Sequence, residues 1–277
     1  NWATPDGVVD GTSGADTINS SYSDPNFDRV DDGVGTGADG MGDSISAGGG
    51  ADHVTAGYGD DTISGGGGND TIYGDFATET ISNVETLQWT NQGGSGTNIS
   101  SGFTQDTGDV NVDVSFTTTA STQSITTSTA GQNTDGGVYA SNSSLYMVGG
   151  PGVISTTRID FNGEAGSGAA NTVSNVSFLI NDIDAGSWRD VLTVTAFDEA
   201  GNPVPVSMTS LGNDTIVGQT VTAANTSDQP TQNAGTVRVT IPSSVHRVEI
   251  LYENTGATTS LIHVTDVKFS TSVVVEG

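Results

Sequence analysis

The sequence predicts an all-β protein in which a short parallel β-roll, residues 1–82, precedes an antiparallel β-sandwich, residues 83–277. Three observations predict this arrangement. Between residues 43 and 81 an acidic residue recurs every nine positions, with an aliphatic residue two places after it. From about residue 83 the composition shifts to Thr, Ser, Val and Asn, and apolar and polar residues alternate along several runs. No run shows a convincing helical periodicity.

The nine-residue period predicts one short strand and one tight turn per repeat. Glycine permits the positive φ angles of the turn, and strand side chains alternate in direction, so the aliphatic residue points inward. Its neighbours, such as Thr62 and Ser64, then face water. Two repeats form one coil. The acids are Asp43, Asp52, Asp61, Asp70 and, in a degenerate copy, Glu79, and the aliphatics are Ile45, Val54, Ile63, Ile72 and Ile81.

Acids two repeats apart are expected on the same edge of the roll, so Asp43 and Asp61 share one edge, and Asp52 and Asp70 the other. A further copy, residues 14–18, places Asp16 three periods before Asp43. Two readings of residues 20–38 stay open, a loop or degenerate coils, because Pro25 and Val34 stand where acids are expected. Residues 75–79 lack the glycines and are expected to cap the roll.

Each edge would gather carboxylates and main-chain carbonyls between successive turns. Calcium accepts six to eight such oxygen ligands at about 2.3–2.6 Å, whereas magnesium requires a stricter octahedron and keeps its waters. Without a cation the stacked aspartates repel, and a core of single aliphatics does not offset the chain entropy. We therefore expect several calcium ions, whose binding is coupled to folding. The residues expected to form these sites are Asp16, Asp43, Gly48, Gly50, Asp52, Gly57, Gly59, Asp60, Asp61, Gly66, Gly68, Asn69 and Asp70.

The repeat resembles the nonapeptide G-G-x-G-x-D-x-(aliphatic)-x of the RTX, or haemolysin-type, calcium-binding repeats. Residues 47–55, 56–64 and 65–73 carry the pattern best, whereas the copy ending near Ser46 has Asp39 and Met41 where glycines belong. The resemblance covers at most the first 82 residues. It implies export from a Gram-negative bacterium by type I secretion, with folding outside the cell on contact with calcium.

The composition excludes several classes of partner. A net charge of −27, with six basic residues, opposes binding to nucleic acids and anionic membranes. The absence of cysteine excludes disulfides and, with the calcium repeats, favours an extracellular or cell-surface location. No run approaches the roughly 18 apolar residues of a membrane span. Because the chain starts at Asn1 and shows no signal peptide, we expect a processed product or a fragment.

The second part of the chain is expected to form two packed antiparallel sheets, in a jelly-roll-like sandwich. Apolar residues alternate cleanly along 110–116, 176–180 and 192–196. Through residues 175–184 and 264–269 this part resembles the β-sandwich modules that accompany RTX repeats in secreted bacterial proteins, and carbohydrate-binding jelly rolls.

One inter-strand loop of the sandwich concentrates acids beside a tryptophan. Asp182, Asp184 and Asp190 are candidates for a further calcium site, and Trp188 is a candidate for stacking on a sugar ring. The alternative is that the aspartates cap turns while Trp188 covers the end of the sandwich. That alternative is favoured, because turn-capping by aspartate alone explains such acids.

No enzymatic activity is expected, since the chain lacks H-E-x-x-H, G-x-S-x-G and G-K-[ST] motifs. The leading hypothesis is a secreted calcium-binding structural or adhesive protein of the cell surface or extracellular matrix. An unpaired coil end at the N-terminal side of the roll would allow a homo-oligomer or a self-assembling fibre. The alternative is a carbohydrate-binding module of a secreted polysaccharide-degrading enzyme, with a surface glycan as its partner.

Overall fold

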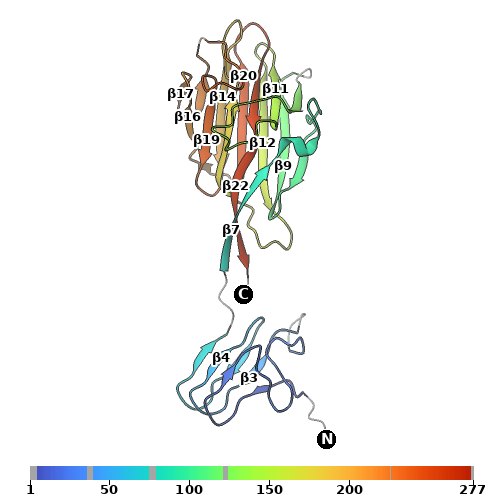
Figure 1. Ribbon diagram of the computed structural model, residues 1–277, viewed down its shortest axis with the longest axis vertical. Helices are drawn as coiled ribbons and strands as arrows, with labels where there is room; N and C mark the ends of the chain where they lie inside the picture. The colour runs from blue at the N-terminus through green and yellow to red at the C-terminus, as the bar shows by residue number, and fades with distance from the viewer. Residues whose placement is uncertain (1–4, 36–39, 75–78, 121–123, 225, 276–277) are drawn as a thin grey trace. The chain divides into compact units, whose positions relative to one another are not determined.

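The computed structural model describes residues 5–35, 40–74, 79–120, 124–224 and 226–275 (Figure 1). The chain divides into two compact units, Asn1–Thr80 with Val274–Gly277, and Ile81–Val273. The predicted all-β fold class is confirmed, since the helical structure in the described ranges is one 3-10 turn, η1 (Trp89–Gln92). No helix in these ranges has the length and apolarity needed to cross a bilayer.

The first unit is a parallel β-roll. Its pairs Ile45–Ile63 and Val54–Ile72 each join residues 18 apart, which confirms the predicted coil of two nonapeptides. One sheet has the order β1-β3-β5 and the other β2-β4-β6. The strands are β1 (Val9–Asp10), β2 (Thr17–Ile18), β3 (Ser44–Ser46), β4 (His53–Thr55), β5 (Thr62–Ser64) and β6 (Thr71–Tyr73).

Residues 20–35, the described part of the segment left open above, form a loop that contributes no strand to the roll. Val9 pairs with Ile45 and Thr17 with His53, so each of these partners is 36 residues away, the length of two coils. A stretch of chain as long as one coil therefore contributes no strand to either sheet. The loop is nevertheless packed, because its Val30 is buried in the roll core.

The N-terminal end of the roll is covered, contrary to the open end expected there. Tyr22 packs against the core and donates its hydroxyl to the Asp10 carbonyl at 2.9 Å. The Asp10 amide, on the outer edge of β1, donates to Asp24 Oδ2 at 3.2 Å. Exposed apolar side chains also occur in the last coil, where Ile72 is 44% and Tyr73 52% exposed, as they do in the loop at Phe27 and Val34.

The degenerate fifth repeat does not extend the roll. Ile81, expected to be the last inward aliphatic, lies in β7 (Glu79–Leu87), which pairs with β22 (Val267–Val275). Ile81 is 41% exposed and belongs to the second unit. The cap expected from residues 75–79 falls largely on 75–78, which lie outside the described residues.

The second unit consists of two eight-stranded antiparallel sheets. One has the order β10-β11-β21-β13-β19-β16, with β22 beside β13 and β7 beside β22; the other has the order β17-β18-β14-β20-β12-β9-β8, with β15 beside β14. Their further strands are β8 (Phe103–Asp106), β9 (Val110–Thr118), β10 (Ile125–Ser128), β11 (Ser144–Gly149), β12 (Ile154–Gly163), β13 (Ser174–Asn181), β14 (Asp190–Phe197), β15 (Pro203–Val204), β16 (Ser207–Ser210), β17 (Thr215–Val217), β18 (Thr220–Thr222), β19 (Val237–Ile241), β20 (Arg247–Asn254) and β21 (Ser260–Thr265).

The predicted alternation correctly identifies the core face of the sandwich strands. Val112 and Val194 are fully buried in one large hydrophobic cluster, while their strand neighbours are more exposed. Phe178 lies in the same cluster, but its neighbour Leu179 is also fully buried, because both faces of β13 are covered from Phe178 onward. Trp89 is also fully buried in this cluster and donates its indole N–H to the Thr265 carbonyl at 2.8 Å.

Candidate calcium sites

Three turns stack on one side of the roll, each just before a strand of the β2-β4-β6 sheet. Main-chain hydrogen bonds hold them together, from the Gly49 amide to the Thr12 carbonyl at 2.9 Å and from the Gly67 amide to the Gly48 carbonyl at 3.0 Å. Main-chain oxygens of successive coils are therefore gathered on one side. We call this side the Asp52 edge; it comprises residues 12–16, 48–52 and 66–70.

The carboxylates of the Asp52 edge follow one another from coil to coil. The amide of Asp16 donates to Asp52 Oδ1 at 2.8 Å, and the amide of Asp52 donates to Asp70 Oδ1 at 3.0 Å. The sequence predicted that Asp52 and Asp70 share an edge, and Asp16 joins them on it. Asp52 is only 2% exposed, and its Oδ2 is buried without a hydrogen-bond partner in the described part of the chain.

An unsatisfied buried carboxylate oxygen is costly, by about 1–3 kcal/mol or more for a charged group. A cation on the Asp52 edge would satisfy Asp52 Oδ2 and offset the repulsion between stacked carboxylates. No three His, Cys, Asp or Glu side chains in the described ranges are arranged to hold a metal by themselves. Calcium bound here would therefore use main-chain carbonyls beside the aspartates, which suits its preference for many oxygen ligands.

The glycines of this edge are required by the backbone. Gly48, Gly50, Gly66 and Gly68 all have positive φ angles, which favour glycine. They also lie where neighbouring turns approach most closely. A Cβ on Gly68, at φ 135°, would lie 1.6 Å from the Gly50 carbonyl oxygen.

Gly68→Ala is therefore expected to disrupt the Asp52 edge, because the new methyl group overlaps a main-chain oxygen of the adjacent coil. We expect at least a tenfold higher calcium concentration at the midpoint of folding, measured by circular dichroism. Gly67→Ala is the matched control, since a Cβ there has no heavy atom within 4 Å and its φ is not positive. Equal midpoints for the two variants would contradict this assignment.

The opposite side of the roll, which we call the Asp43 edge, contains Asp43, Asp61, the turn 57–61 and, unexpectedly, Asp31. The Asp43 amide donates to Asp61 Oδ1 at 2.8 Å, which confirms that these two acids share an edge. The Asp31 amide donates to Asp43 Oδ2 at 2.8 Å, and Asp31 Oδ1 accepts the Tyr58 amide at 2.9 Å. Asp31 thus takes the place of an acid from a preceding coil.

The Asp43 edge accumulates negative charge. Burial raises the pKa of Asp43, and the carboxylates of Asp61, Asp31 and Asp32 raise it further. A bound cation would lower the pKa of Asp43 and offset both effects.

Asp60 lies exposed in the turn before Asp61, and Asn69 lies exposed in the corresponding turn of the Asp52 edge. Gly57 and Gly59 have positive φ angles, as the turn requires.

Comparison with known protein families identifies the roll. Residues 37–76 match four copies of the RTX calcium-binding nonapeptide repeat. Residues 37–76 of the roll are similar to RTX repeats. This confirms the resemblance found in the sequence, and it supports calcium as the ion of the two edges. The match does not extend to Asp16 or Asp31, which join the edges from outside the RTX repeats.

Comparisons with whole proteins add little. No curated protein matches the chain. Among solved structures, the enzymatically active domain of tailspike protein 4 of bacteriophage CBA120 is 13% identical, with a TM-score of 0.31, over 58% of this chain and 19% of that one. A family 11 carbohydrate-binding module of a cellulosomal cellulase of Clostridium thermocellum is 7% identical, with a TM-score of 0.25, over 63% of this chain and 95% of that one. Neither TM-score is high enough to support an argument.

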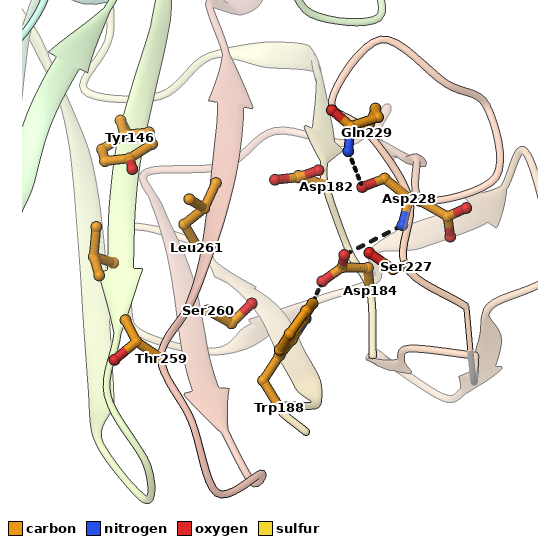
Figure 2. A pocket seen from close by; sticks show the side chains of 11 residues that line it. Tyr146, Asp182, Asp184, Trp188, Ser227, Asp228, Gln229, Thr259, Ser260 and Leu261 are labelled. Carbon is orange, nitrogen blue, oxygen red and sulfur yellow. Dashed lines mark hydrogen bonds between the residues drawn. The ribbon is translucent and has the colours of Figure 1, made fainter. Parts of the chain in front are cut away.

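In the sandwich, the three acids proposed as a further site have different surroundings. Asp182 and Asp184 line a pocket of about 520 Å³ together with Trp188 (Figure 2). Asp190 is fully buried at the start of β14. Its Oδ1 accepts the Tyr252 hydroxyl at 2.9 Å, and its Oδ2 accepts the Ser260 hydroxyl at 3.0 Å. Asp190 thus ties strands together, with both oxygens engaged.

Asp184 positions the tryptophan of this pocket. One of its carboxylate oxygens accepts the indole N–H of Trp188, and the other accepts the Asp228 amide at 3.2 Å (Figure 2). The Asp184 carboxylate therefore links Trp188 to a distant loop rather than capping its own turn, and Trp188 forms part of the pocket wall. Sequence reasoning did not anticipate Asp228, which reaches the pocket from a distant loop.

Proposed function

We propose that this chain is a secreted, calcium-stabilised structural or adhesive protein of the cell surface or extracellular matrix. The buried Asp52 Oδ2, unpartnered in the described ranges within a stack of RTX turns, carries the proposal because it couples calcium to the folding of the roll. In this proposal the protein leaves a Gram-negative cell by type I secretion, folds where calcium is abundant, and has no enzymatic activity. The sandwich supplies the contact surface.

The exposed last coil supports a self-assembling form of this function. Strands β5 and β6 each pair on one side only in the described ranges, and Ile72 and Tyr73 expose apolar surface there. An unpaired strand with apolar side chains is a template for another chain. We infer that copies associate through this end into an oligomer or a fibre.

Calcium is expected to increase particle size by ordering the last coil, as measured by light scattering and electron microscopy. Ile72→Asp should abolish this growth while leaving the calcium-induced circular dichroism signal intact. Val217→Asp is the matched control, because Val217 is 75% exposed on the sandwich. Monomers under every condition, or equal loss of growth in both variants, would contradict assembly through the last coil.

A second candidate function is carbohydrate binding by the sandwich. Trp188, held by Asp184, lines the pocket beside the hydroxyl groups of Ser227 and Thr259. An aromatic face bordered by hydrogen-bonding groups suits a sugar ring. A glycan array should then show binding that Trp188→Ala removes, and an array without any binding would eliminate this candidate.

A further inference from the structure

The Asp43 edge lacks an acid from the first coil, in contrast to the Asp52 edge. On the Asp52 edge the first coil supplies Asp16, whose amide donates to Asp52 Oδ1 at 2.8 Å. On the Asp43 edge the register of β1 with β3 places Gly7 in line with Asp43. Glycine has no carboxylate, so the first coil offers a cation one charged ligand fewer on this edge than on the other.

Asp31, from the loop 20–35, supplies the missing acid. Its amide donates to Asp43 Oδ2 at 2.8 Å, the same amide-to-carboxylate contact that links successive acids of the Asp52 edge. Its Oδ1 accepts the Tyr58 amide at 2.9 Å, whereas the equivalent amide on the Asp52 edge, that of Gly49, donates to a main-chain carbonyl. The Asp31 carboxylate therefore accepts a hydrogen bond that a neutral oxygen accepts on the other edge.

The turn 57–61 is shaped to admit the Asp31 carboxylate. A Cβ on Gly57 would lie 2.0 Å from Asp31 Oδ2 and 2.8 Å from Asp31 Oδ1, so both oxygens lie beside this turn. The turn and Asp43 fall within the residues that match the RTX calcium-binding repeat. Calcium is therefore expected at this edge on grounds independent of Asp31. A further carboxylate beside main-chain carbonyls suits the oxygen ligands that calcium prefers.

Apolar contact alone holds the loop 20–35 weakly to the roll. Val30 is buried in the roll core, and Tyr22 packs against that core only in part. The only basic residue of the loop, Arg29, is exposed. Four aspartates of the loop oppose an edge that is itself acidic, and a cation between them would offset this repulsion. They are Asp24, Asp28, Asp31 and Asp32.

We propose that Asp31 is a calcium ligand of the Asp43 edge, and that calcium bound there latches the loop 20–35 onto the roll. The loop covers the outer edge of β1, since Asp24 Oδ2 accepts the Asp10 amide at 3.2 Å. The N-terminal end of the roll is therefore closed only when calcium is bound, and its removal exposes a strand edge there. This inference rests on calcium binding by the roll, as in the proposed function, and is independent of adhesion and assembly.

Trypsin reports whether the loop is latched. Arg29 is the only lysine or arginine among residues 1–157, and the bond after it leads to Val30, which is 3% exposed. Cleavage at this bond requires Val30 to leave the roll core. Release of residues 1–29 from the full chain, followed by mass spectrometry, should be slow in saturating calcium and fast in chelator.

Asp31→Asn tests the latch, because it preserves the hydrogen bonds of Asp31 and removes its charge. The asparagine oxygen still accepts the Tyr58 amide, and the main-chain amide still donates to Asp43. Protection of Arg29 should then need about tenfold more calcium, because the loss of a group that merely supports a metal ligand already costs about 10–100-fold in affinity. A range of calcium concentrations should appear in which circular dichroism shows the roll strands formed while Arg29 is cut.

Asp32→Asn is the matched control. It removes the same charge from the next residue, which is exposed and whose Oδ1 accepts the Val34 amide at 2.9 Å. It should shift the calcium requirement far less than Asp31→Asn. Each cleavage rate is divided by that of the same variant in chelator, which removes any direct effect of the substitution on the protease.

Several outcomes would overturn the latch. Equal shifts in the two variants would mean that calcium responds to the overall charge of the loop, and an unchanged midpoint in Asp31→Asn would make Asp31 a purely structural residue. If protection of Arg29 and the dichroism signal shift together, the loop unfolds with the roll and is no separate latch. In all three cases the roll still folds with calcium. Failure of the proposed function differs, since the roll strands would then form equally with and without calcium.

Discussion

Chelation of calcium is expected to unfold the strands of the roll, residues 9–73, while the sandwich stays folded. The two units have separate hydrophobic clusters, and that of the roll is much the smaller. Its large buried aliphatics are Val9, Ile18, Val30, Ile45 and Val54. Against this core stand the stacked carboxylates of both edges, whose repulsion is uncompensated without a cation. Amide hydrogen exchange should show protection lost at Val54 and retained at Val194.

Calcium should restore the roll steeply, since each bound ion adds stability by about 1.4 kcal/mol per tenfold rise in free calcium above its Kd. Magnesium should act weakly, because it fits a carbonyl-rich site poorly.

Asp52→Asn is expected to raise the calcium midpoint about tenfold by removing a buried ligand charge. Asp106→Asn, in an exposed turn of the sandwich, should leave that midpoint unchanged. Strands of the roll that persist in chelator would show that they fold without a metal.

The sequence was sufficient to predict the register of the roll, because a fixed period leaves little freedom in how strands pair. Once Asp43 and Asp52 are assigned to alternate edges, the burial of Ile45 and Val54 follows from the alternation of strand side chains. The same logic identified the core positions of the sandwich strands. In both units local periodicity matches the direction of burial, except where both faces of a strand are covered, as at Leu179, and where the roll ends, as at Ile72.

Features without a period were not predictable in this way. Asp31 joins the Asp43 edge although it lies outside the nine-residue phase, because a packed loop folds back across a whole coil length. Only the turn-like run Asp31-Asp32-Gly33 hinted at a special conformation. Asp228 approaches Asp184, to which its amide donates at 3.2 Å, from a loop 44 residues away, so their proximity depends on tertiary structure.

Asp190 was one candidate ligand of a further calcium site, although turn-capping was the favoured alternative, and in the structure it is a buried hydrogen-bond acceptor. Its oxygens receive hydrogen bonds from the Asp184 amide, the Tyr252 hydroxyl and the Ser260 hydroxyl. Acid-rich loops look alike in sequence whether their carboxylates face solvent, a cation or the protein itself. The difference lies in the donors that the rest of the fold provides.

Asp190→Asn is expected to reduce the pH dependence of stability. Burial raises the pKa of Asp190 to about 7, although hydrogen bonds from Asp184, Tyr252 and Ser260 lower it. Between pH 4 and 7 the folded protein therefore retains a proton that the unfolded chain releases. As the pH rises across this window, the unfolding free energy of the wild type should fall, relative to that of the variant, by about 1.4 kcal/mol per pH unit. Urea unfolding in saturating calcium, followed by tryptophan fluorescence, measures this difference.

The pH profile of the wild type has to be compared with that of Asp190→Asn, because other groups also titrate in this range. Burial lowers the pKa of His263 to about 4, so this group makes the folded state more stable as the pH rises towards 6.5, opposite to Asp190. Both proteins contain His263, and its contribution cancels. If the two pH profiles run parallel, the three hydrogen bonds outweigh burial and keep Asp190 ionised. If they diverge as expected, Asp190 is protonated at mildly acidic pH, and its contribution to the stability of the strand ends beside the pocket is greatest at that pH.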